Sequence, residues 1–223
     1  MSLQFIVTAL LFIGFIFIMI FTEYVQKRYD VDSEHTRKFA HIIATLSSLI
    51  FIFTVDSHWY VLFVGGTLGL VLFIGKQKGY IKSITSVDRK TGGSYILPIS
   101  IYLTFLISDL FDNDLLFILP ILILGISDPL AGILGKKHRN KTKEITVLSY
   151  TFNKTILGSF VFFISAFLIS LLTLYFFNYS FYKIILLSSI IAVSTTVIEI
   201  ISSKGIDNIS VPLSAVFILM ILG

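Results

Sequence analysis

The chain contains no cysteine, so disulfide bonds, thiolate catalysis and cysteine-based metal sites are excluded. It is also poor in charge, since charged residues make up 13% of its 223 residues and hydrophobic residues 56%. The four histidines lack the spacing of a zinc-binding motif. This composition argues against an ordinary soluble domain and favours a membrane protein.

The net charge of +4 is carried by basic residues that lie between long apolar runs. Nucleic acid is therefore not the expected partner. Anionic membrane lipid, or a phosphorylated ligand, fits this distribution better.

Eight apolar stretches, the shortest of 17 residues, are long enough to cross a hydrocarbon core of about 30 Å. They cover residues 2–22, 39–55, 59–75, 95–111, 115–135, 156–177, 182–202 and 205–223. The first stretch lacks a basic region before it and a cleavage site after it, so we interpret it as a retained span. The sequence predicts an all-α transmembrane bundle of about eight spans, forming a single integral membrane domain over residues 1–223.

The positive charge is distributed on one side of these stretches. Sixteen of the 17 Lys and Arg residues fall in alternate connections, and Lys183 is the exception. The positive-inside rule places these connections in the cytoplasm and both termini outside. We expect a multi-pass protein of the bacterial inner membrane or an equivalent membrane.

Three carboxylates, Asp128, Glu199 and Asp207, lie in or at the edge of apolar stretches. Ionisable groups are costly in hydrocarbon, so they usually face a protein interior or a wet cavity. Glu199 equally fits a side chain that reaches the aqueous edge, and Asp207 equally fits a helix N-cap.

Asp128 lies in the sequence Gly-Ile-Ser-Asp-Pro-Leu-Ala-Gly. Pro129 removes a backbone donor and disfavours the α conformation at Asp128. We expect the helix to break here, with Ser127 or Asp128 capping a short second helix. Asp128 would lie roughly 20 Å from the outer face, where a broken backbone needs protein or water beside it.

Further polar sets are predicted on the cytoplasmic side. Arg37 and His41 share a helix face at i, i+4, and Gly92-Gly93 precede a span. Lys154-Thr155 with Gly158-Ser159 opens the sixth span with residue types that bind phosphate. The alternative for Arg37 and His41 is a charged flank of the span. The alternative for the two glycine-containing segments is an ordinary helix start. Together with the carboxylates, these sets supply what phosphoryl transfer needs.

Four motifs follow one another along the chain. They are Glu34…Arg37-Lys38…His41, Asp128-Pro-Leu-Ala-Gly…Gly135-Lys136-Lys137, Lys154-Thr155…Gly158-Ser159 and Asp207-Asn208-Ile-Ser-Val-Pro212. This set, from about residue 34 to 213, resembles the polyprenol kinase family of dolichol kinases, phytol and farnesol kinases and CTP-dependent diacylglycerol kinases. Family members usually carry a second glycine after the one at Gly135 and an acidic residue where this chain has Leu157.

The resemblance implies a CTP-dependent kinase of lipid metabolism, which phosphorylates the hydroxyl of a membrane lipid alcohol with Mg²⁺ or another divalent cation. The expected catalytic residues are Asp128, His41, Arg37 and Lys38. The expected nucleotide contacts are Lys136, Lys154, Thr155, Gly158, Ser159, Gly92, Gly93 and Asn208. The expected metal ligands are Asp128, Asp207 and Glu199, one of which would otherwise accept the alcohol proton.

Two other functions fit the same residues. A phosphatidate cytidylyltransferase-like enzyme would use CTP with attack at the α rather than the γ phosphorus. A transporter would use a discontinuous helix at Asp128, although such proteins often show repeats that this sequence lacks. The identity of the alcohol stays open among phytol, farnesol, polyprenols and diacylglycerol, because an apolar pocket discriminates weakly between them.

Overall fold

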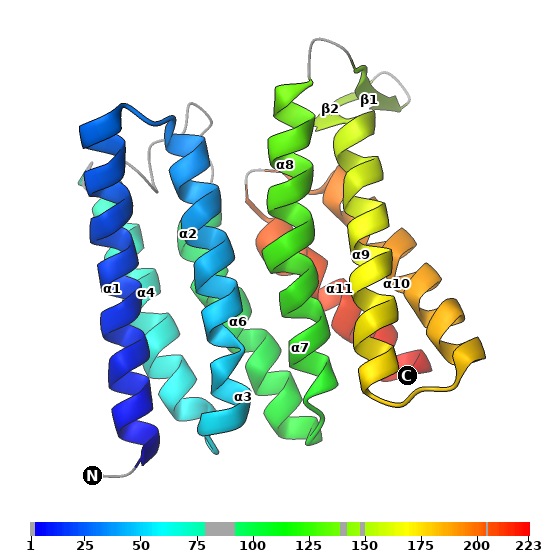
Figure 1. Cartoon of the computed structure of the whole chain (residues 1–223), viewed down its shortest axis with the longest axis horizontal. Helices are drawn as coiled ribbons and strands as arrows, with labels where there is room; N and C mark the ends of the chain where they lie inside the picture. The colour runs from blue at the N-terminus through cyan, green and yellow to red at the C-terminus, as the bar shows by residue number, and fades with distance from the viewer. Residues whose placement is uncertain (1–2, 79–91, 139–141, 148–149, 204) are drawn as a thin grey trace.

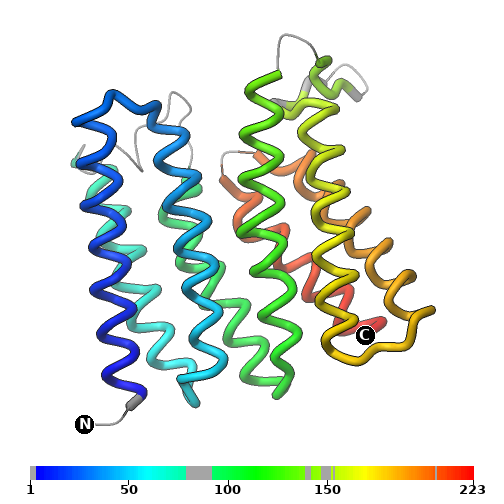
Figure 2. The backbone as a smooth tube through the Cα atoms, viewed as in Figure 1, coloured from blue at the N-terminus to red at the C-terminus, as the bar shows by residue number. Residues whose placement is uncertain are grey.

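The structure, a computed structural model, describes residues 3–78, 92–138, 142–147, 150–203 and 205–223. Its elements, in chain order, are α1 Leu3–Tyr29, α2 Ser33–Ser48, α3 Ile50–Thr54, α4 His58–Gln77, α6 Gly93–Phe111, α7 Leu115–Leu122, the π-helical segment η1 Ile123–Ser127, α8 Asp128–Lys137, β1 Glu144–Val147, β2 Tyr150–Thr155, α9 Ile156–Phe176, α10 Phe181–Ile201 and α11 Asp207–Leu222. The helices run up and down in one bundle, and both termini lie at the same end of it (Figures 1 and 2).

The predicted all-α membrane bundle is confirmed. Within the described residues, seven helical segments are long and apolar enough to cross a membrane, with α2–α3 and α7–η1–α8 each counted as one. The eighth, α11, has 16 residues and is about 24 Å long, shorter than the other spans. Hydroxyl groups inside the apolar helices bond back to their own backbone, as Thr104 does to the carbonyl of Ser100. The chain is an integral membrane protein.

The core divides into two apolar clusters on either side of the α7–η1–α8 span. Leu119 and Ile123 pack into the first cluster, with α9, α10 and α11. Phe117 and Ile121 pack into the second cluster, with α1, α3, α4 and α6. Figure 1 shows the resulting halves, with α1, α2, α4 and α6 on one side and α8 to α11 on the other. We call the boundary, where α2 faces η1 and α8 and where α11 meets α6, the seam.

In place of the expected break at Asp128, the structure has a π-helical turn within a continuous helix. The chain stays helical from Leu115 to Lys137, and Asp128 keeps α dihedral angles despite the proline that follows it. Ser127 makes no capping hydrogen bond, so the predicted cap is wrong. The missing donor of Pro129 is instead accommodated by the π-helical turn of Ile123–Ser127. Because the helix continues, Asp128 is held rigidly.

The connection between α8 and α9 contains a feature that the sequence did not predict. Strands β1 and β2 pair as an antiparallel hairpin, with Glu144 opposite Thr155 and Val147 opposite Tyr150. The last residue of β2, Thr155, is also the N-cap of α9. The hairpin therefore fixes Lys154 at the start of a transmembrane helix.

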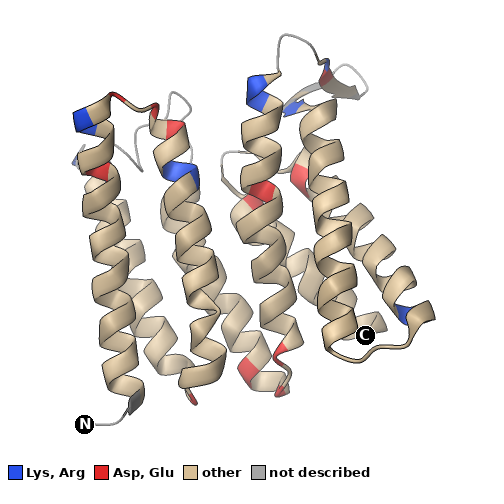
Figure 3. Cartoon of the chain, viewed as in Figure 1, with Lys and Arg blue, Asp and Glu red and all other residues tan. Residues whose placement is uncertain are grey.

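Charged side chains separate along the bundle (Figure 3). In the described part of the chain, Lys and Arg gather at the end where α1 and α8 finish, and Lys183 in the first turn of α10 lies at the other end. That other end carries acidic residues at the ends of α3, α6 and α7. The folded chain thus keeps the asymmetry that the sequence shows.

A close backbone contact joins the start of α6 to the turn before α11. Gly205 has a φ of 90°, and a Cβ there would collide with the backbone of Gly93. Only glycine suits both requirements, because a side chain is strained at this φ and has no space. The two elements come from opposite halves, so this contact helps to close the seam.

We expect Gly205→Ala to destabilise the protein by on the order of 2 kcal/mol or more, through left-handed strain and displacement of α6. The melting temperature in detergent measures this loss of stability. Gly66→Ala is the matched control, because a Cβ at Gly66 meets nothing within 4 Å and alanine favours a helix interior. Equal melting temperatures for the two variants would contradict the close contact.

Candidate functional site

A buried ion pair crosses the seam at the centre of the candidate site. The ammonium of Lys38, in the second turn of α2, lies 2.6 Å from Oδ2 of Asp128 at the start of α8. It also donates to the backbone carbonyl of Asp128 at 3.3 Å. The two side chains are only 7% and 9% exposed. Each charge has its counter-charge within the bundle, which an apolar interior requires.

His41 continues the seam one turn further along α2. Its Nε2 donates to the carbonyl of Leu124, inside the π-helical segment, at 3.1 Å. A carbonyl only accepts, so in the neutral ring this bond leaves Nδ1 as an acceptor. One turn further along α2, Thr45 packs directly on Gly125, where a Cβ would collide with the threonine hydroxyl. The irregular backbone of this segment thus lies against protein, one of the two surroundings that the sequence led us to expect.

A second ionic group joins the hairpin to α10 and α11. The ammonium of Lys154 lies 2.5 Å from Oε1 of Glu199 and 3.1 Å from Oδ2 of Asp207. Ser159 donates to the other oxygen of Glu199 at 3.4 Å. Burial lowers the pKa of Lys154, but the charges of Asp207, Glu199 and Asp128 raise it above its usual value overall. Lys154 therefore stays protonated at neutral pH.

The two ionic groups are neighbours, because α8, which begins with Asp128, packs closely at Ala131 and Gly135 on Gly158, in the first turn of α9 after Lys154. The three predicted metal ligands are nevertheless divided. Asp128 is paired with Lys38, whereas Glu199 and Asp207 converge on one ammonium. In the part of the chain that the structure describes, no three His, Asp or Glu side chains form a metal cluster. Glu199 with Asp207 fits the donor set of Mg²⁺, which often takes one or two carboxylates plus substrate phosphates.

The α11 start and the α6 start meet beside Arg37. Asn208 donates to the carbonyl of Gly93 at 2.7 Å, and a Cβ on Gly93 would lie 3.6 Å from the guanidinium of Arg37. Gly92 is the N-cap of α6. The structure thus brings together the predicted residues Arg37, Gly92, Gly93 and Asn208, and it gives Gly93 and Asn208 a structural role as well.

The predicted residues at the α9 start serve helix contact. The Thr155 hydroxyl caps the helix by accepting from the Gly158 backbone at 3.1 Å. A Cβ on Gly158 would lie 3.1 Å from the Ala131 carbonyl and 3.5 Å from Gly135 Cα. These glycines let α8 and α9 approach closely, which places Asp128 near Lys154.

Lys136 lies apart from the buried groups. It is half exposed at the end of α8 and pairs with Asp32 at 2.7 Å and Glu34 at 3.0 Å, on α2 and its N-cap. The Lys136 hydrogen bond is the main reason why the pKa of Asp32 is lowered. Because Glu34 pairs here and Lys38 pairs with Asp128, these two i, i+4 neighbours on α2 do not pair with each other.

Sequence reasoning missed two parts of the site. One is the buried hydroxyl of Ser127, expected from the sequence only as a helix cap, which lies immediately before Asp128 and has no hydrogen-bond partner among the described residues. The other is an apolar cavity that has Arg37, His41 and Asn208 among its lining residues. Neither has a signal in the sequence, because a lone serine and apolar helix faces are common in membrane proteins.

Fold and site together define a polytopic α-helical membrane protein with buried ion pairs at the seam between two halves. The chain is 30% identical over 203 residues to "Uncharacterized protein RP860" of Rickettsia prowazekii (strain Madrid E), covering 85% of this chain and 94% of that one. The chain belongs to the same family as this Rickettsia protein. No family model matches the chain, and no solved structure matches it.

The Lys38–Asp128 pair across the seam allows a quantitative test. Lys38→Met would leave Asp128 buried without a cation, so we expect a loss of about 3–5 kcal/mol in stability. The double variant Lys38→Met, Asp128→Leu should recover much of this loss, since both charges are then gone. Unfolding in detergent provides the double-mutant cycle.

Lys136→Met is the control for that cycle. Its ion pairs are half exposed, so the expected loss is about 0–1 kcal/mol. A double variant as unstable as Lys38→Met alone would show that the two residues do not interact across the seam.

Proposed function

We propose that the protein is a kinase that transfers the γ-phosphoryl group of CTP to the hydroxyl of a membrane lipid alcohol. One observation carries the proposal: the ionic groups Lys38–Asp128 and Lys154–Glu199–Asp207 lie together at the cation-rich end of the bundle, beside the polar end of an apolar cavity. A charged site for a triphosphate next to an apolar site for a lipid suits this reaction. The choice of CTP rests on the motif resemblance alone.

In the proposed reaction, the alcohol oxygen attacks the γ phosphorus. The bond from that phosphorus to the bridging oxygen breaks, CDP leaves, and the hydroxyl loses its proton. His41 lies at the polar end of the cavity, and in the neutral ring its Nδ1 is an acceptor. We assign this proton to His41, because Asp128 and Glu199 are each held by a lysine.

The cations of the site would neutralise the triphosphate. Phosphoryl transfer through a loose transition state depends on positioning and charge stabilisation more than on a strong base. Lys38 and Lys154 are held in place by their carboxylates, so they are preorganised donors. Glu199 and Asp207 would hold Mg²⁺, which when bound supplies charge neutralisation of the phosphates.

The proposed orientation places the cation-rich end, with the hairpin, in the cytoplasm. The positive-inside rule supports this, because Lys and Arg gather there and acidic residues lie at the opposite end. CTP would then arrive from the cytoplasm, while the alcohol enters from the bilayer.

Purified protein supplied with γ-labelled CTP, Mg²⁺ and a panel of lipid alcohols tests the reaction. We expect a labelled lipid monophosphate and release of CDP. Release of pyrophosphate with a CDP-lipid would instead establish the cytidylyltransferase. Solute flux in vesicles that Asp128→Asn abolishes, with no effect of CTP on the protein, would establish the transporter.

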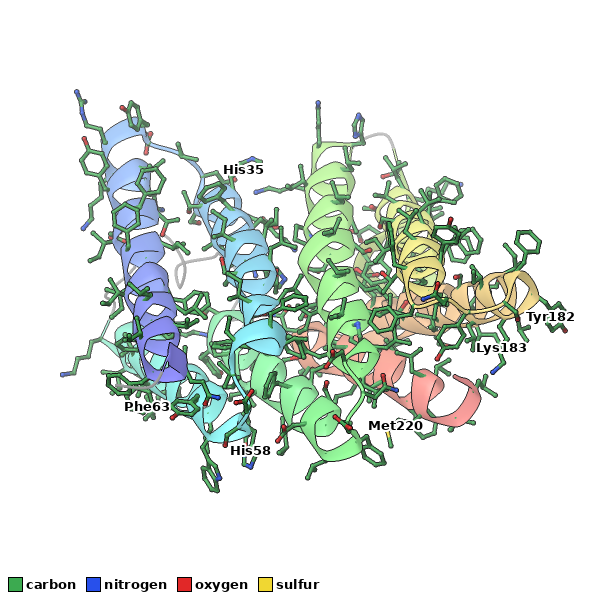
Figure 4. All side chains as sticks on the ribbon, turned by 60° about the horizontal axis from the view of Figure 1, so that its bottom comes forward. His35, His58, Phe63, Tyr182, Lys183 and Met220 are labelled. Atoms are coloured by element: carbon green, nitrogen blue, oxygen red, sulfur yellow. The ribbon has the colours of Figure 1, made fainter. Side chains whose placement is uncertain are left out.

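Asp207→Asn tests whether Glu199 and Asp207 hold the metal, because it removes one charge with little change in shape. We expect kcat to fall by about 10²–10³-fold, because the variant removes charge from the proposed metal site. Lys183→Met is the control, since Lys183 projects from the outer end of α10, away from the ionic groups (Figure 4). A fall of less than about tenfold, with unchanged thermal stability, would argue against Asp207 as a ligand.

A further inference from the structure

An apolar cavity runs between α1, α2, α4 and α6, in the half of the bundle that lacks the acidic residues of the site. Part of this space is open to the outside. Along α2 and α3 the lining runs from Arg37 to Phe51, which at about 1.5 Å per residue is roughly 21 Å. This length exceeds half of a hydrocarbon core of about 30 Å, the part that one lipid chain occupies.

The two ends of the cavity differ in chemistry. Arg37, His41, Gly93 and Asn208 line the end next to the ionic groups. The helices alternate in direction, so Phe51, Val61 and Ile101 line the far end. All three are buried core residues that pack into one cluster. The cavity is thus polar at one end and closed by apolar side chains at the other.

Small residues create the space. Ala40 and Ala44 of α2 and Gly65 of α4 line the cavity between its ends. Larger side chains at Ala40 or Ala44 would fill it, whereas a Cβ at Gly65 would lie 3.1 Å from the Pro98 carbonyl of α6. A long, largely apolar space of this kind is suited to a hydrocarbon chain, since Ser48, the polar side chain on its α2 wall between the ends, already donates to the Thr45 carbonyl.

At the polar end, one group lacks a partner. Nε of Arg37 is buried and makes no hydrogen bond to any residue that the structure describes. A buried donor without a partner costs free energy, so a bound oxygen atom at this end would be stabilised. An occupant with an apolar chain and a single oxygen-bearing head matches both parts of the cavity.

We propose that this cavity holds one hydrocarbon chain of the lipid alcohol, with its oxygen at the Arg37–His41 end, and that the depth of the cavity selects the chain length. The assignment of the occupant as the phosphoryl acceptor rests on the proposed function. The cavity is a single space with a closed end, so a diacylglycerol would place only one of its chains inside. The favoured occupant is therefore a single-chain alcohol.

Ala44→Phe tests the cavity by filling it midway. The probe is hexadecanol with a diazirine at its chain end, added to protein in detergent without CTP. In the unchanged protein, we expect the photolabel at the far end, around Phe51, Val61 and Ile101. In Ala44→Phe, labelling by this probe should fall about tenfold, while labelling by the corresponding octanol probe is retained. Val193→Phe, which adds the same ring to the exposed face of α10, should change neither.

Val61→Ala provides the opposite test and keeps a small apolar side chain at the far end. It deepens the cavity, so unlabelled octadecanol should compete better against the hexadecanol probe than it does in the unchanged protein. Unlabelled farnesol and diacylglycerol serve as further competitors, and weaker competition by diacylglycerol is expected. Competition by diacylglycerol that is stronger than that of farnesol would overturn the single-chain assignment.

Photolabel outside the cavity, or equal labelling of Ala44→Phe by both probes, would overturn the proposed site. These measurements need no phosphoryl transfer, so they separate the two proposals. Labelling in the cavity without any phosphorylation in the CTP assay would contradict the kinase and leave the lipid site standing. Phosphorylation that is indifferent to Ala44→Phe would contradict the cavity and leave the kinase standing.

Discussion

The structure depends on one constraint: charges inside an apolar bundle must be paired. Lys38 and Asp128 meet this constraint across the seam, from helices in different halves of the molecule. The neighbouring contacts, from His41 to the Leu124 carbonyl and from Asn208 to the Gly93 carbonyl, join the same halves. These polar contacts close the seam, together with the α7–η1–α8 span, whose apolar residues pack into the clusters of both halves.

A polar seam has a chemical consequence. A buried ion pair contributes little net stability over an apolar replacement, because desolvation offsets the attraction. Its preorganised charges are, however, available to a ligand that brings its own. Lys154, shared by Glu199 and Asp207, is arranged in the same way beside the first pair. A triphosphate with its metal would exchange partners with groups that are already in place, and little reorganisation would be needed.

The arrangement would also give the proposed reaction access to both of its substrates. A lipid alcohol and a nucleotide differ in solubility, so one site must face both the bilayer and the aqueous phase. The cavity ends at Arg37, His41 and Asn208, each of which is adjacent in sequence or in space to the ionic groups. In the proposed reaction, the lipid chain and the charged donor would thus be separated by α2 and the start of α11, and they would meet only at the seam.

The sequence by itself determined the membrane class, the helical spans and the one-sided charge, because span length and composition are local properties. It also singled out Asp128, Glu199 and Asp207, since carboxylates in apolar runs need a reason. Only the tertiary structure decided how they pair, the form of the helix at Pro129 and the hairpin that places Lys154. These features, like the cavity, arise from contacts between residues far apart in the chain, which local patterns do not encode.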